Sequence, residues 1–232
     1  MFACSQCAVR KSAICKSLTD ETLAEFSKFG HNRSVKRGQT LLWEGEESLL
    51  VGNVINGVFK LSISTPDGRE QTLGIAYPSD FIGRPFGKKG RQSVTALTDA
   101  QVCTFTRSDF DAFAHGHSGL EHMLLERTLM DLDHAREWLL LLGRKSAGER
   151  LATFLLEMGS RLGDNVSSDS GHQAVQFDLP FGRQEIGDLL GLTIETVSRQ
   201  FTKLRDEGVI DTPGRRSIVI LDQETLEEHA GL

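Results

Sequence analysis

The sequence predicts an α+β fold with three parts: an N-terminal jelly-roll-like sheet domain, a long helix and a C-terminal winged helix-turn-helix. Three observations support this prediction. Short alternating segments separated by Gly and Pro fill the first half of the chain, and a long stretch with apolar residues three or four positions apart follows them. Near the C-terminus, two short amphipathic segments joined by a glycine precede a basic hairpin. This order of patterns places a sheet domain before a helical one.

Composition and length describe a globular chain large enough for two domains, with 232 residues of which 39% are hydrophobic. Apolar runs such as Leu139–Leu142 are far shorter than the roughly 20 residues that cross a bilayer, so no membrane segment is expected. The N-terminus lacks the basic and apolar regions of a secretory signal, which predicts a cytoplasmic protein. The net charge of -6 argues against a generally nucleic-acid-coated protein, but residues 199–216 carry five basic and three acidic side chains.

The sheet domain is predicted over residues 19–117, after a Cys-rich arm at residues 1–18. Thr19 can cap a short helix that continues to about Phe29. Asn56-Gly57 and Pro66-Asp67-Gly68 are turn signals, and the first favours a tight hairpin with positive φ. The strands between such signals are short and regularly spaced, as in a jelly roll or barrel: Thr40–Trp43, Val51–Ile55, Phe59–Ser64, Gln71–Ala76, Ser93–Leu97 and Val102–Thr106.

A dimerisation helix is predicted over residues 118–143, where apolar side chains form a seam with polar neighbours. A seam of this length fits pairing with the same helix of a second subunit. The alternative is that the stripe packs against its own sheet domain, and we expect both contacts on different faces of the helix. The predicted homodimer interface consists of Leu125, Leu129, Leu132, Ala135, Leu139 and Leu142.

The second domain is predicted over residues 144–232, after a hinge at residues 143–146. It begins with an amphipathic helix, Arg150–Leu162, and a polar loop, Gly163–Gly171. Two further helices follow whose apolar faces can pack together, lined by Ile186, Leu189 and Leu190 in the first and by Val197, Phe201 and Leu204 in the second.

Turn and wing signals frame the two packed helices. Gly191 permits the sharp turn between them, and Gly208 suits the left-handed position that ends the second. A Pro213-Gly214 turn then separates Val209-Ile210 from the alternating segment Ser217–Leu221. This pattern predicts a wing hairpin behind the second helix.

The second of these helices presents polar side chains at its N-terminal end, where a recognition helix meets base edges in the major groove. Arg199 can donate to guanine O6 and N7, Glu195 can accept from the cytosine amine, and Ser198 tolerates several bases. The alternative is an ordinary salt bridge between Glu195 and Arg199 on a solvated helix, but within this motif we favour DNA. The predicted contacts with double-stranded DNA are Thr193, Glu195, Ser198, Arg199, Lys203, Arg215 and Arg216.

Three of the four cysteines, Cys4, Cys7 and Cys15, fall within twelve residues. In a reducing compartment such a group is more often a metal site than a set of disulfides. Thiolates hold both iron-sulfur clusters and structural zinc, and a reversible thiol switch is a further alternative. Cys103, on an apparent strand between apolar neighbours, is by itself interpreted as a buried structural thiol.

Enzyme activity is not expected. The sequence contains no nucleophile elbow, P-loop, dinucleotide fingerprint or His-Glu-x-x-His motif, and its seven histidines are scattered.

The segment Thr193-Ile-Glu-Thr-Val-Ser-Arg199, after a hairpin-rich domain and a long seamed helix, resembles the CRP/FNR family of bacterial transcription factors. Asp80-Phe-Ile-Gly83 is similar to the family's β-roll motif, and Arg144–Leu151 to its hinge. The resemblance covers nearly the whole chain. It implies a β-roll sensor domain, a homodimer, a palindromic DNA site and RNA polymerase as a partner.

The cyclic-nucleotide-binding branch of that family continues the β-roll motif with a Glu for the ribose and an Arg-Ser pair for the phosphate. This chain instead has Arg84-Pro85 after Gly83, and Gly90-Arg91 or Gln92-Ser93 in place of the pair. We therefore expect no cyclic-nucleotide sensing, although Arg84 and Arg91 could serve another anion.

The pattern Glu195, Ser198 and Arg199 matches the FNR-like branch, whose members sense oxygen through a 4Fe-4S cluster. The resemblance implies Cys4, Cys7, Cys15 and Cys103 as ligands, although the gap between the second and third cysteines is longer than in the best-known members. The resulting hypothesis is that an intact cluster orders the arm and favours dimerisation and DNA binding. Structural zinc, a thiol-redox switch, no cofactor, or a small-molecule effector in the β-roll remain alternatives.

Overall fold

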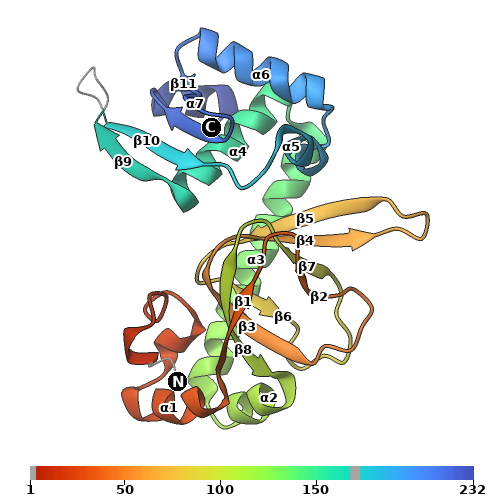
Figure 1. Cartoon of the computed structure of the whole chain (residues 1–232), viewed down its shortest axis with the longest axis vertical. Helices are drawn as coiled ribbons and strands as arrows, with labels where there is room; N and C mark the ends of the chain where they lie inside the picture. The colour runs from red at the N-terminus through yellow and green to blue at the C-terminus, as the bar shows by residue number, and fades with distance from the viewer. Residues whose placement is uncertain (1–3, 168–172) are drawn as a thin grey trace. The chain divides into compact units, whose positions relative to one another are not determined.

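The computed structural model describes residues 4–167 and 173–232 and divides into two compact units, one ending at Ala135 and the other running from Arg136 to Leu232 (Figure 1). The long helix α3, Ser118–Arg144, belongs to both. The predicted limits of the arm, sheet domain, dimerisation helix and second domain stay predictions, and residues 1–3 of the arm lie outside the described residues.

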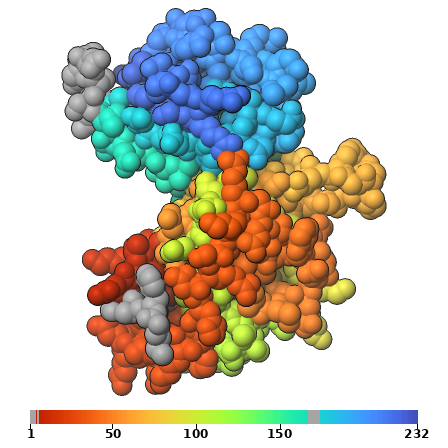
Figure 2. Space-filling model, viewed as in Figure 1, coloured from red at the N-terminus to blue at the C-terminus, as the bar shows by residue number. Residues whose placement is uncertain are grey.

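The N-terminal arm is a short irregular segment with two 3-10 turns, Cys4–Gln6 and Ile14–Ser17. In the space-filling view it lies at one side of the first unit (Figure 2). Helix α1, Asp20–Phe26, follows, and a 3-10 turn extends it to Phe29. The Thr19 hydroxyl accepts from the Thr22 backbone N–H at 3.3 Å, which agrees with the predicted cap.

Two four-stranded antiparallel sheets follow in this unit, with strand orders β1-β8-β3-β6 and β2-β7-β4-β5. One core cluster contains buried residues of both sheets, among them Val54 and Val102 of the first and Phe59 and Val94 of the second, so the core lies between the sheets. The strands are β1 His31–Val35, β2 Thr40–Leu42, β3 Leu50–Asn56, β4 Phe59–Ser64, β5 Glu70–Ala76, β6 Phe81–Gly83, β7 Ser93–Ala96 and β8 Ala100–Thr106.

All six predicted strands are present, and the predicted hairpin glycines, Gly57 and Gly68, both have φ of 86°. Strand β1 lies before the first predicted strand, and its exposed residues show no apolar alternation. Strand β6 is only three residues long. Their pairing with β8 and β3, rather than a local pattern, makes both segments strands.

Helix α2, Arg107–His115, follows β8 directly and was not predicted. Thr106 caps it by accepting from the Asp109 backbone N–H at 3.2 Å. Phe110 of α2 joins a second core cluster with Phe26 of α1 and Phe105 of β8. Leu120 and Leu124 of α3 belong to the same cluster, so the first part of α3 packs on its own domain as expected.

The second unit contains helix α4, Ala147–Leu162, which begins with a capping box between Ser146 and Glu149. Its sheet has the order β11-β12-β10-β9. The remaining elements are β9 Asp164–Ser167, β10 Gln173–Asp178, α5 Arg183–Leu190, α6 Ile194–Asp206, β11 Ile210–Asp211, β12 Ser217–Ile220 and α7 Gln223–Ala230.

The polar loop predicted at Gly163–Gly171 is wrong at residues 164–167, which form β9. Asn165 and Val166 pair with Val175 and Ala174 of β10, so cross-strand hydrogen bonding decides the conformation of a segment whose composition suggests a loop. The end of that predicted loop falls on residues 168–171, outside the described residues. None of the helices that the structure describes combines the length and the apolar character needed to cross a membrane.

A four-cysteine cavity and a helix-turn-helix surface as candidate functional sites

All four cysteines line one cavity in the first unit. Cys4 and Cys15 come from the 3-10 turns of the arm, Cys7 from the loop between them, and Cys103 from β8. Each thiol is free and partly buried. The fold therefore brings the one distant cysteine to the three that are close in sequence, as the resemblance implied.

Apolar side chains form most of the remaining wall of this cavity. Leu23 and Phe26 of α1 lie on one side, and Phe105 of β8 continues the face that carries Cys103. Val9 and Ala13 of the arm are buried against them. The thiols thus lie in a low-dielectric environment, which disfavours an isolated thiolate.

Burial raises the pKa of the Cys15 thiol to about 12, and neighbouring Cys103, Cys4 and Cys7 add to the shift because nearby thiolates repel one another. Burial likewise raises the pKa of Cys103 to about 12, with Cys4 and Cys7 as further causes. For Cys4, burial and Cys7 raise the pKa, whereas the Arg10 guanidinium opposes the shift. Cys4, Cys15 and Cys103 therefore favour the neutral thiol unless a cation compensates the negative charge of the thiolates.

Four sulfur donors fit a thiophilic metal or cluster by their chemistry. Among residues 4–167 and 173–232, no three His, Cys, Asp or Glu side chains are already arranged around a metal position, and the cavity measures about 30 Å³. A cluster is larger than this space, so the four thiols would have to lie farther apart around a cluster than they do in the metal-free structure.

The helix-turn-helix of the second unit is formed by α5 and α6, joined at Gly191, which has φ of 64°. Ile186 and Leu189 of α5 and Val197 and Phe201 of α6 are all buried, which confirms the packing of the two apolar faces. The Thr193 hydroxyl accepts from the Thr196 backbone N–H at 3.3 Å and caps α6.

Glu195, Ser198 and Arg199 lie exposed on the first two turns of α6. Arg199 Nη2 donates to Thr196 Oγ1 at 3.4 Å, rather than pairing with Glu195. The pKa of Glu195 lies below its ordinary value because its own backbone N–H and the Thr193 hydroxyl donate to the carboxylate. The side chains are therefore presented to solvent in a form that can accept and donate at base edges.

The other predicted DNA contacts differ in their surroundings. Lys203 is exposed, with Nζ 3.8 Å from a Glu207 oxygen, and Arg215 is exposed in the wing turn. Arg216 is half-buried and donates to the Pro180 carbonyl at 3.3 Å, so it also holds the segment before α5.

Sequence reasoning missed Arg183, the first residue of α5. Its guanidinium lies 3.1 Å from the centroid of the Phe201 ring, and burial lowers its pKa to about 10. Nη1 is buried without a hydrogen-bond partner among the described residues. The sequence feature that could have drawn attention to Arg183 is its place as a basic residue at the start of α5.

The predicted dimer seam is largely uncovered in the single chain. Leu129 is 52% exposed and Leu139 is 72% exposed, and Leu125 and Leu132 are also exposed. Ala135 is exposed and Leu142 half-buried. Met130 and Leu140 next to the seam are exposed as well.

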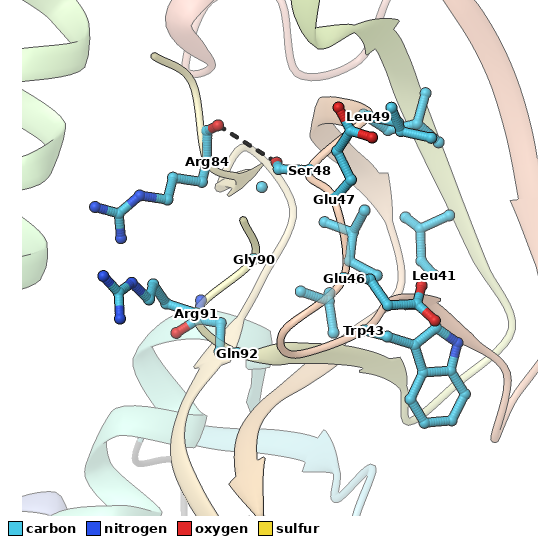
Figure 3. Close-up of a pocket in the computed structure, with 14 residues that line it drawn as sticks. Leu41, Trp43, Glu46, Glu47, Ser48, Leu49, Arg84, Gly90, Arg91 and Gln92 are labelled. Carbon is cyan, nitrogen blue, oxygen red and sulfur yellow. Dashed lines mark hydrogen bonds between the residues drawn. The ribbon is translucent and has the colours of Figure 1, made fainter. Parts of the chain in front are cut away.

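A separate pocket of about 300 Å³ lies in the β-roll, between the segment Leu41–Leu50 and residues 83–94 (Figure 3). Arg84 and Arg91 extend in the same direction on one side of it, and Glu46 and Glu47 lie on the other. The Ser48 hydroxyl donates to the Arg84 carbonyl at 3.4 Å across the pocket wall.

Comparison with known proteins agrees with this architecture. A family model described as a cyclic nucleotide-binding domain matches residues 32–117, and one described as a Crp-like helix-turn-helix domain matches residues 149–229. The fold and the exposed recognition helix define a DNA-binding transcription regulator, not an enzyme.

This chain belongs to the CRP/FNR family. It is 40% identical to the transcriptional activator protein FnrL of Cereibacter sphaeroides over 231 residues, which cover 100% of this chain and 93% of the relative. It is 39% identical to the nitrogen fixation regulation protein FixK of Bradyrhizobium diazoefficiens, covering 89% and 85%. The solved structure of FixK2 from Bradyrhizobium japonicum matches with a TM-score of 0.76 at 34% identity, covering 86% and 96%.

Proposed function

We propose that this protein is a homodimeric, oxygen-sensing transcription regulator that binds a palindromic FNR-type site when a 4Fe-4S cluster is held by Cys4, Cys7, Cys15 and Cys103. The observation that carries the proposal is the convergence of all four thiols on one cavity. Four cysteine thiolates are the common ligand set of such a cluster. When bound, the cluster supplies an oxygen-labile link between the arm and β8.

The arm is connected to α3 through apolar packing. Ile14 and Leu18, which flank Cys15, are buried in the same core cluster as Leu120 and Leu124 of α3. The position of Cys15 therefore affects the surface on which the first part of α3 rests. This contact supports the view that the state of the cysteine site biases the dimerisation helix.

Dimerisation through α3 is supported by the exposed seam, because a row of large apolar side chains on a helix is normally covered by another surface. Two recognition helices in a symmetric dimer can then reach two half-sites about one DNA turn apart. RNA polymerase is the further partner we propose, since FnrL is a transcriptional activator by name.

A second candidate is a regulator controlled by a small molecule in the β-roll, with zinc, a thiol switch or no cofactor at the cysteines. The pocket between Glu46, Glu47, Arg84 and Arg91 favours it, because it combines apolar walls with two guanidinium groups.

Anaerobic purification separates the two candidates. We expect stoichiometric iron and acid-labile sulfide per subunit and a visible absorbance that bleaches in air, together with DNA binding that weakens in parallel. Cys103→Ser should lose iron, whereas Asn32→Ala, opposite Cys103 on β1 and exposed, should retain it. Zinc or no metal in the wild type would reject the oxygen-sensing proposal and turn attention to the β-roll pocket.

A further inference from the structure

An amide group lies inside the four-cysteine cavity. Asn53 of β3 is 2% exposed and lines the cavity with the thiols. It is the direct partner of Cys103 in the antiparallel register of β3 and β8, so the two side chains leave the same face of the sheet. The sheet therefore places Asn53 and Cys103 side by side beneath the arm.

The two polar atoms of this amide differ in their partners. Nδ2 donates to Cys15 Sγ at 3.7 Å, whereas Oδ1 is buried and has no hydrogen-bond partner in the part of the chain that the structure describes. An unpaired buried acceptor opposes folding, and an apolar side chain of similar size would remove that cost. In the metal-free fold the amide therefore makes one hydrogen bond to a neutral thiol, which is a weak acceptor, and leaves its oxygen unpaired among the described residues.

Few other donors face the cavity. Apart from the thiols, Arg10 is the one other described lining residue whose side chain carries an N–H, and it forms an ion pair with Asp20. The wall around Asn53 is otherwise apolar, which strengthens a hydrogen bond made there.

We propose that Asn53 is a positioning residue of the cysteine site that donates an N–H···S hydrogen bond to Cys15 when this sulfur is a thiolate ligand. The inference rests on the proposed iron-sulfur function. A hydrogen bond to an ionised acceptor is stronger than one to a neutral thiol, so Asn53 stabilises the ligated form selectively. It also withdraws electron density from the sulfur, and hydrogen bonds to sulfur are among the factors that set cluster stability and potential.

The test compares wild-type protein, Asn53→Leu and Asn53→Ala, each loaded without oxygen. Both variants should bind iron and sulfide, but their visible absorbance should decay in air about threefold to tenfold faster than in the wild type. Under nitrogen, they should also release iron faster to a ferrous chelator. The matched control is Asn32→Leu, which pairs with Cys103 from β1 but is exposed and does not line the cavity, so it should behave as wild type.

The outcomes separate this inference from the proposed function. Equal rates of decay and iron release in the wild type and both Asn53 variants would overturn the role of Asn53 and leave the iron-sulfur assignment intact. A lower Tm of metal-free Asn53→Leu, with unchanged decay of the loaded protein, would show a purely structural role and also overturn it. Wild-type protein without iron and sulfide would reject both proposals.

Discussion

Asp80 and Arg127 form an ion pair that joins the loop before β6 to α3, with 15% and 21% of the respective side chains exposed. Asp80 Oδ2 also accepts from the Tyr77 backbone N–H at 2.9 Å. Its neighbour Ser79 has φ of 81°, and the Ser79 hydroxyl lies 2.6 Å from that of Ser12 in the arm. One short loop therefore contacts both the cysteine-bearing arm and α3.

Breaking this ion pair should destabilise the first unit. Arg127→Met keeps much of the side-chain length but leaves Asp80 without its cation, and we expect a loss of about 2 to 3 kcal/mol in the free energy of unfolding. Urea denaturation of the metal-free protein measures it. Arg69→Met is the control, because its pair with Asp67 at 2.9 Å is exposed and screened by solvent, so its loss should leave the free energy of unfolding nearly unchanged. Equal losses of unfolding free energy in Arg127→Met and Arg69→Met would show that burial does not strengthen the pair of Asp80 and Arg127.

Close backbone approach at Gly52 should make this position intolerant of a side chain. A Cβ there would lie 2.5 Å from the Cys103 carbonyl oxygen, so Gly52→Ala must move β3 or β8. We expect a loss of about 2 to 3 kcal/mol in unfolding free energy and poorer retention of iron. Gly116→Ala, whose Cβ would meet the Phe113 carbonyl at an ordinary 3.5 Å, should change stability by less than about 0.5 kcal/mol. A stable, iron-retaining Gly52→Ala would contradict the close approach of the two strands at this position.

The two kinds of DNA contact predicted on α6 should be separable. Arg199→Ala should cost about 1 to 3 kcal/mol and relax the preference at one base pair, because a bidentate guanine contact is lost. Lys203→Ala should weaken binding on all sequences alike. It should also reduce the slope of the logarithm of the binding constant against the logarithm of the salt concentration by about one. Fluorescence anisotropy with a consensus and a point-altered duplex at several salt concentrations distinguishes them. Arg205→Ala, in the last turn beside Asp206, is the control and should bind normally.

Metal-free protein should lose stability in alkali because of its buried thiols. The folded protein holds the pKa of Cys15 at about 12, above the roughly 8.5 of an unfolded thiol. The contribution is therefore fully present below the unfolded pKa and lost as pH rises towards the folded one. Tm measured across this range should fall in the wild type and fall less in Cys15→Ser. Parallel curves for the two proteins would mean that the thiol is not buried in the metal-free state.

Local patterns accounted for the elements that have a sequence period or a distinctive turn. The six predicted strands of the β-roll, the helix begun by Thr19, the two helices packed across Gly191 and the seam on α3 could all be predicted in this way. Each depends on residues a few positions apart, so its signal is present in the sequence itself.

Segments without such a signal could be assigned only once the strands or side chains that they contact were known. Strand β9 has the composition of a loop and becomes a strand by pairing with β10, and the mostly exposed β1 becomes one by pairing with β8. The buried position of the Arg183 guanidinium is explained by the Phe201 ring of the next helix, over which it lies.

The candidate site shows the same division. The sequence by itself determined that Cys4, Cys7 and Cys15 are clustered and that α6 presents Glu195, Ser198 and Arg199, because these residues are neighbours along the chain or along one helix. Only the tertiary structure decided that Cys103 joins the other thiols and that Asn53 lies among them. Both side chains reach the cavity through the register of β8 and β3, and a register between distant strands depends on the packing of the whole sheet.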